Sequence, residues 1–156
     1  MTPEEKIQAE LTGQFSFLEQ SIKIARPRRI FIDLSYDKFD QVFSYLAKKM
    51  DFTFLGTIIG SDEGERFSVI YHLVSGGNIV LNLKTFVPKE NPVLKSVMPM
   101  FVNAEVYERE MVDLLGIDVQ GLPEGNRYPL TDDWPKDEHP LRKDWKPSNS
   151  QKEGAV

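Results

Sequence analysis

Acid–base side chains concentrate between residues 105 and 117, where the sequence reads EVYEREMVDLLGI. In a helix, Glu105, Arg109 and Asp113 would share one face at i, i+4 spacing. Paired carboxylates can carry general acid–base chemistry when their surroundings push their pKa values apart. The same spacing is more typical of a surface ladder of salt bridges, with Glu105 in the favourable position before Arg109.

Glu110 stands apart from that ladder. In a helix it falls on the row of Val106 and Leu114, within an otherwise apolar arc. A carboxylate in such a place needs a cation or must face an interface, because an unpaired buried charge is costly. The sequence therefore favours a structural ion-pair network over a catalytic acid. The candidate cations lie further along the chain and are Arg127, Arg142 and Lys143.

Other polar clusters do not have the spacing of a metal or nucleophile site. The acidic runs at 132–133 and 137–138 lack the alternating ligands and turn glycine of a calcium loop. His72 and His139 have no third ligand at zinc-site spacing. No glycine-rich phosphate loop precedes a helix, and no nucleophile-elbow pattern occurs. We therefore expect no catalytic residue, no metal and no cofactor in this chain.

Composition narrows the function further. The 156-residue chain has no cysteine, which excludes disulfides and cysteine-ligated iron–sulfur or zinc sites. A formal charge of -5 argues against nucleic-acid binding, which needs a basic face. The N-terminus does not resemble a secretory signal, and no apolar run is long enough to span a bilayer. These features predict a soluble, cytosolic protein.

The elements that must position these residues can be predicted from hydrophobic periodicity. The pattern predicts an α+β fold, with helices packed on a mixed or mostly antiparallel sheet of about four strands. Serine- and glycine-rich turns indicate that the last three strands form a meander. The expected helices are 3–21, 37–50 and 103–115, the last stopped by Gly116, and the expected strands are 29–34, 52–60, 67–74 and 78–86.

The character of the chain changes after residue 117. Five of the ten prolines and both tryptophans follow, without helical or strand periodicity. We expect three regions: an α+β domain (1–117), an extended, proline-rich, partner-docking arm (118–147) and a disordered tail (148–156). Residues 118–147 are called the C-terminal segment below. Extended chains with aromatic anchors suit grooves, so this segment either wraps its own domain or lies on a partner.

Several separate motifs follow one another in the last third of the chain: Glu108-Arg109-Glu110, Asp113, Leu115-Gly116-Ile117, Pro123, Arg127, Leu130-Thr131-Asp132 and His139-Pro140-Leu141-Arg142-Lys143-Asp144-Trp145. Together they resemble the signature of the C subunit of respiratory complex I and its relatives in membrane-bound nickel-iron hydrogenases. The chain departs from the complex I pattern at Leu122-Pro123 and around Arg127, where a histidine and a double arginine are usual. These departures favour the short hydrogenase-type subunits.

The resemblance implies a cofactor-free accessory subunit of a membrane-associated electron-transfer complex, not catalytic in isolation. Such subunits hold the large, hydrogenase-like subunit, near iron–sulfur subunits, on the cytoplasmic face of the membrane, with membrane association only through the complex. The implied interface and scaffold residues are Glu108, Arg109, Glu110, Asp113, Gly116, Arg127, Asp132, Trp134, Pro140, Leu141, Arg142, Lys143, Asp144 and Trp145.

Two alternatives have a basis in the residues. A generic module could recognise a peptide or regulatory protein through its sheet or C-terminal segment, outside any respiratory complex. A small acid–base enzyme could use Glu108, Glu110, Asp113 and His139 together, and would require a concave pocket around them.

Overall fold

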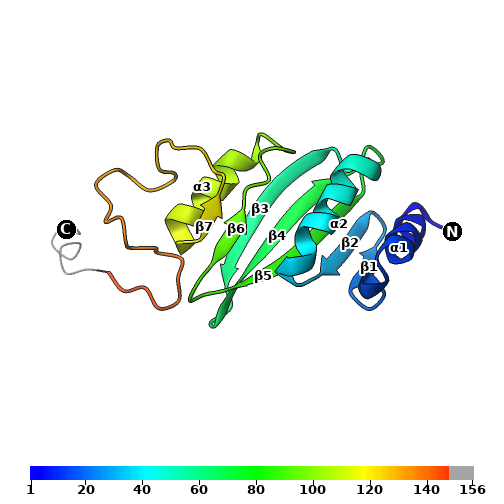
Figure 1. The fold of residues 1–156 in the computed structure, drawn as a ribbon, viewed down its shortest axis with the longest axis horizontal. Helices are drawn as coiled ribbons and strands as arrows, with labels where there is room; N and C mark the ends of the chain where they lie inside the picture. The colour runs from blue at the N-terminus through cyan, green and yellow to red at the C-terminus, as the bar shows by residue number, and fades with distance from the viewer. Residues whose placement is uncertain (148–156) are drawn as a thin grey trace.

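The computed structural model describes residues 1–147, which form three α-helices, one 3-10 turn and seven strands (Figure 1). The α+β prediction is confirmed. The elements are α1 (Pro3–Gln14), η1 (Ser16–Leu18), β1 (Ile22–Arg26), β2 (Arg29–Asp33), α2 (Tyr36–Lys49), β3 (Phe54–Asp62), β4 (Arg66–Val74), β5 (Val80–Pro88), β6 (Val93–Lys95), α3 (Ala104–Leu115) and β7 (Asp118–Gln120).

The main sheet is mixed and has five strands, in the order β1-β2-β5-β4-β3. β3, β4 and β5 form the predicted antiparallel meander, and β2 joins it by parallel pairing with β5. β6 and β7 form a separate parallel pair on either side of α3 in the chain. The extra strand of the main sheet is β1, which the sequence pattern did not reveal.

The predicted N-terminal helix was too long. Thr2 caps α1 through a capping box with Glu5, but the helix ends at Gln14. Phe15 leaves helical geometry, and η1 then turns the chain into β1. Phe15 and Leu18 nevertheless point into the core, because the turn keeps their side chains on the buried side. Apolar residues at helical spacing therefore belong here to two elements and not to one helix.

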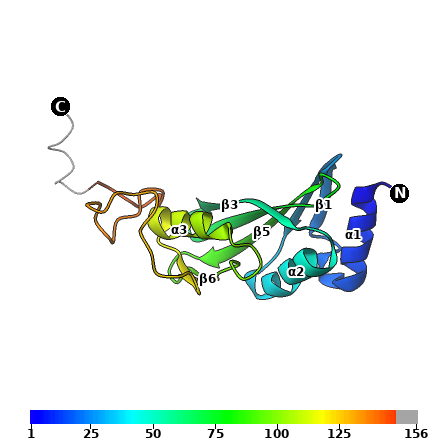
Figure 2. The same ribbon diagram turned by 90° about the horizontal axis from the view of Figure 1, so that it is seen from above.

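The core lies between the sheet and the helices. One face of α2 is apolar, as predicted, and buries Phe39, Val42, Phe43 and Leu46. The rings of Phe39 and Phe43 lie 4.6 and 5.4 Å from that of Tyr71 on β4. Figure 2 shows α1 and α2 on one side of the sheet.

Helix α3 runs beside the edge strand β3. The side chain of Asn103 donates to the Leu55 carbonyl at 2.8 Å, and the Tyr107 hydroxyl donates to the Gly56 carbonyl at 3.0 Å. At Gly60 a Cβ atom would lie 2.6 Å from Leu115 Cδ1, so a larger residue would force the Leu115 side chain to shift. The helix therefore contacts the strand along its length, as the two ribbons show in Figure 1.

Residues 121–147 contain no helix or strand and follow α3 at the end of the molecule opposite α1 (Figure 1). The predicted tail at 148–156 lies outside the described residues. Within the described part of the chain, no helix has the length and apolar character needed to cross a membrane.

Candidate protein-docking site

Asp113 fixes the C-terminal segment to α3. Its carboxylate is buried and accepts from Arg127 Nη2 at 2.6 Å and Nε at 3.0 Å, and from the Leu130 backbone N–H at 2.8 Å. The prediction that Asp113 belongs to a surface ladder was wrong, because the segment covers it. The other half of the ladder is confirmed, since Arg109 pairs with Glu105 at 2.8 Å.

The two arginines also bind carbonyl groups of the C-terminal segment. Arg109 Nη2 donates to the Pro123 carbonyl at 2.7 Å, and Arg127 Nη1 donates to the Trp134 carbonyl at 2.7 Å. A guanidinium can serve several acceptors at once because its five N–H groups form a planar fork. Each arginine therefore holds a carboxylate of α3 and a carbonyl of the segment together.

The C-terminal end of α3 is capped by residues from far along the chain. His139 Nδ1 lies 2.8 Å from the Asp113 carbonyl, and the Leu141 N–H donates to the Leu114 carbonyl at 3.0 Å. The last carbonyls of a helix lack intrahelical partners, so the segment supplies them. Gly116, at φ 72°, ends the helix, and a Cβ there would lie 2.6 Å from His139 Cδ2. The glycine is therefore needed both for the turn and for the histidine.

A second attachment point is Asp62, at the end of β3, which sequence reasoning missed. Its buried carboxylate accepts from Lys89 Nζ at 2.6 Å, the Lys143 backbone N–H at 2.7 Å and the Gly64 N–H at 2.8 Å. Burial alone would raise the pKa of Asp62, but these donors outweigh it and lower the pKa to about 2. No local pattern marks Asp62, because Lys143 is 81 residues away.

Asp62→Asn should lower the free energy of unfolding by about 2 kcal/mol at neutral pH. The folded-state pKa lies below the ordinary value of 3.8, so ionised Asp62 contributes stability above pH 3.8 and loses it as pH falls toward 2. Urea unfolding should therefore show the deficit of the variant shrinking to roughly half by about pH 3. Asp33→Asn, at an exposed position on β2, is the control. A deficit that does not depend on pH would contradict the assignment.

The buried glutamate of α3 is Glu108, and not Glu110 as the helical pattern suggested. Glu108 is 1% exposed and accepts from the Ser96 hydroxyl at 2.7 Å and the Val97 N–H at 2.8 Å. Burial raises its pKa, and the two hydrogen bonds offset part of that effect. Glu108 therefore holds the loop before α3, whereas the segment pairs with Asp113. Among residues 1–147, no cation lies within salt-bridge distance of Glu110.

The two tryptophans pair with each other. Their ring centroids are 5.9 Å apart, and both indole N–H groups donate to Glu138, Trp134 to its carbonyl at 2.9 Å and Trp145 to its carboxylate at 3.0 Å. Both rings are partly exposed. Glu138, which carries no local signal in the sequence, therefore organises the aromatic pair.

The remaining predicted interface residues lie along the same segment. Arg142 Nη1 donates to the Leu115 carbonyl at 3.4 Å, and Arg142 Nε donates to the Asp144 carboxylate at 3.2 Å. Asp144 also pairs with Lys89 at 3.3 Å. Pro140 is partly buried. The exposed members are Asp132, Leu141, Lys143 and Asp144.

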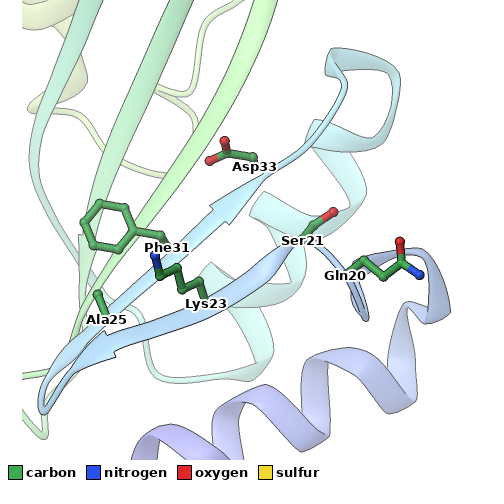
Figure 3. A pocket seen from close by; sticks show the side chains of 6 residues that line it. All are labelled: Gln20, Ser21, Lys23, Ala25, Phe31 and Asp33. Carbon is green, nitrogen blue, oxygen red and sulfur yellow. The ribbon is translucent and has the colours of Figure 1, made fainter.

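A pocket elsewhere contains none of the predicted residues. It lies on the β1–β2 hairpin and is lined by Gln20, Ser21, Lys23, Ala25, Phe31 and Asp33 (Figure 3). Within residues 1–147, no three His, Asp or Glu side chains are grouped so that they could hold a metal ion. Three carboxylates of α3 instead have partners within residues 1–147: Glu105 pairs with Arg109, Glu108 accepts from Ser96, and Asp113 pairs with Arg127.

Fold and site together define an α+β domain whose C-terminal segment is held across its last helix by ion pairs and helix-capping bonds. The chain belongs to the family of the respiratory-chain NADH dehydrogenase 30 Kd subunit, whose model matches residues 32–151. The predicted resemblance to the C subunit of complex I is therefore confirmed.

Similar proteins come from several kinds of electron-transfer complex. The chain is 36% identical over 138 residues to the C subunit of F(420)H(2) dehydrogenase from Methanosarcina mazei, covering 86% of this chain and 87% of that protein. It is 32% identical over 145 residues to hydrogenase-4 component G of Escherichia coli, covering 90% of this chain but 26% of that protein. A chain in the structure of the membrane-bound sulfane sulfur reductase, an archaeal respiratory membrane complex, has the same fold, with a TM-score of 0.83 at 23% identity over 97% of this chain and 91% of that chain.

Proposed function

We propose that this chain is a non-catalytic, cofactor-free accessory subunit of a membrane-associated electron-transfer complex, where it docks and positions the large, hydrogenase-like subunit. The observation that carries the proposal is the Asp113–Arg127 pair at 2.6 Å, which holds the C-terminal segment across α3. The signature residues Arg109, Asp113 and Arg127 all take part in this attachment, through ion pairs and hydrogen bonds. A segment fixed in this way is preorganised for binding, because less conformational entropy is lost when a partner docks.

The outward side of the C-terminal segment carries the side chains for the partner. Tyr128 is 47% exposed and Leu141 is 55% exposed, and the Trp134–Trp145 pair is partly exposed. Aromatic residues are enriched at the centres of interfaces because they bury a large area with little loss of entropy. Exposed Lys143 and Asp144 would lie at the polar rim.

The parent complex is proposed to be of the complex I or energy-converting hydrogenase type, with this subunit peripheral on the cytoplasmic face and next to iron–sulfur subunits. Relatives named as dehydrogenase and hydrogenase subunits support both types. Electron-transfer centres must keep fixed separations, so a rigid accessory subunit affects turnover without carrying electrons.

The acid–base alternative loses support from the geometry. Glu108 binds the loop at Ser96 and Val97, whereas Asp113 binds Arg127 on the C-terminal segment. The two carboxylates therefore serve separate structural partners.

The direct test is purification of the N-terminally tagged chain from its native cell in gentle detergent, with mass spectrometry of the proteins that accompany it. Recovery of a nickel-iron-type large subunit, iron–sulfur subunits and membrane proteins is expected. Recovery of the chain alone, or with an unrelated regulatory protein, would overturn the proposal and favour a generic binding module.

Arg142→Ala and Trp145→Ala should leave the isolated domain folded and reduce its incorporation into the complex, by about tenfold for each substitution. Circular dichroism measures the fold, and the yield of co-purified large subunit measures incorporation. Lys146→Ala, at an exposed neighbouring position, is the control. If either variant unfolds the isolated domain, the segment acts as an internal strap and not as a docking element.

A further inference from the structure

Exposed apolar side chains gather along the flank formed by β3 and α3. Nine large hydrophobic residues are exposed in the described chain, and five of them are Phe54, Ile59, Val102, Val106 and Leu141. The first two lie on β3, Val102 lies just before α3 and Val106 in its first turn, and Leu141 is bonded to the end of α3. Ile59 and Leu141 also line one groove, and exposed apolar groups at a groove are typical of interaction sites.

A groove runs between the two elements on this flank. It has a volume of about 190 Å³ and lies between residues 57–60 of β3 and residues 110–115 of α3, with Leu141 at its side; we call it the β3–α3 groove. β3 is an edge strand, paired only with β4. Within residues 1–147, the only side-chain hydrogen bonds to its backbone are those at Leu55 and Gly56. Because α3 lies against β3 from Leu55 to Gly60, the opening is a groove between a strand and a helix and not a free strand edge.

Glu110 sets the charge of the groove. It lies one helical turn from Val106 and one from Leu114, and it lines the groove itself. On α3, Glu105 pairs with Arg109 and Asp113 pairs with Arg127. Within residues 1–147, by contrast, no cation lies within salt-bridge distance of Glu110. Because the side chains around Glu110 are apolar, a ligand that brings a cation to this carboxylate is bound more favourably than one that does not.

We propose that the β3–α3 groove binds an extended segment of a neighbouring subunit. The segment lies in the groove, places an apolar side chain between Ile59 and Leu114, and pairs a lysine or arginine with Glu110. This inference rests on the proposed function, because the bound segment belongs to the same complex. It assigns a second contact surface, separate from the aromatic pair of the C-terminal segment.

The test places a photo-cross-linking amino acid at Val106 of the full chain in its native cell, and maps the cross-linked peptide in the purified complex. The expected peptide belongs to another subunit and has a lysine or arginine beside apolar residues. The same amino acid at Phe17, which is similarly exposed on η1, is the control. A peptide without a basic residue, one from a second copy of this chain, or no cross-link in the recovered complex overturns the inference.

Charge reversal provides the second measurement. Glu110→Lys should lower the yield of the complex by about tenfold, and changing the cross-linked basic residue to glutamate should restore it. Ile59→Lys, which leaves α3 unchanged, should also lower the yield of the complex. Glu19→Lys, at an exposed position close to η1, is the control and should leave the yield unchanged. Thermal unfolding of each variant separates loss of binding from loss of fold.

The outcomes distinguish the two proposals. If the wild-type chain is recovered alone, both fail. If it is recovered with the complex but Glu110→Lys and Ile59→Lys give the same yield as the wild type, the groove is not a contact surface and the proposed function stands.

Discussion

Asp113→Ala should detach the C-terminal segment while the sheet and α2 remain folded. The substitution leaves Arg127 without its carboxylate and the Leu130 N–H without an acceptor. Removing one partner of a buried ion pair costs about 3 kcal/mol, which corresponds to a roughly hundredfold increase in the open form. Limited proteolysis with trypsin should show this as much faster cleavage after Arg127, and circular dichroism should show little change.

The matched control is Asp118→Ala, because Asp118 is an exposed carboxylate on β7 near the same helix. It should leave cleavage after Arg127 unchanged. If Asp113→Ala cleaves at the wild-type rate, the other contacts, at His139, Leu141 and Asp62, hold the segment by themselves. If the whole domain unfolds, the segment is part of the cooperative core.

Glu108→Ala should lower the free energy of unfolding by about 3 kcal/mol. The change removes the acceptor of the Ser96 hydroxyl and the Val97 N–H, both buried, and opens a cavity beside the core. Urea unfolding followed by tryptophan fluorescence and circular dichroism measures the loss. A loss as small as that of a substitution such as Glu105→Ala, outside the core, would show that this loop is not held by Glu108.

Glu108→Gln separates the shape of this side chain from its charge. Burial raises the pKa of Glu108, so the folded state binds its proton more tightly than the unfolded chain does. The contribution of this group to stability is therefore present at low pH and is lost as pH rises through the folded-state pKa. Glutamine should match or exceed the wild-type stability at pH 7, and the difference should vanish in acid. A stability loss at pH 7 equal to that of Glu108→Ala would contradict this account.

Most elements of the fold could be predicted from local pattern. The meander was predictable because β3, β4 and β5 are nine residues each and are separated by hairpin turns. β1 was not, because Ile22 and Ile24 follow a helix of similar apolar spacing, and Gly13, the glycine nearest the break at Phe15, lies inside α1 and not at its end. β6 and β7 have three residues each, too few to show a period.

The sequence predicted which residues belong to the candidate site better than it predicted which of them contact one another. Helical periodicity placed Glu110 in the apolar arc, but α3 is buried on two sides, and the loop at Ser96 covers Glu108 instead. Spacing alone places Asp113 on a surface ladder, because it does not show that a later segment crosses α3, whereas the family resemblance implies that Asp113 is a scaffold residue. Asp62 was missed for the same reason, since its partners come from elsewhere in the chain.

The sequence by itself determined three features of this protein. It has no cysteine, its hydrophobic pattern is that of an α+β fold, and a signature of charged and aromatic residues begins in α3 and ends at Trp145. Periodicity is a local property, so it can be read along the chain. Only the tertiary structure decided which groups meet, because the Asp113–Arg127 ion pair and the hydrogen bond from the Lys143 backbone N–H to Asp62 form when segments 14 and 81 residues apart are brought together. Burial then makes each such pair strong or costly, and burial is a property of the folded chain alone.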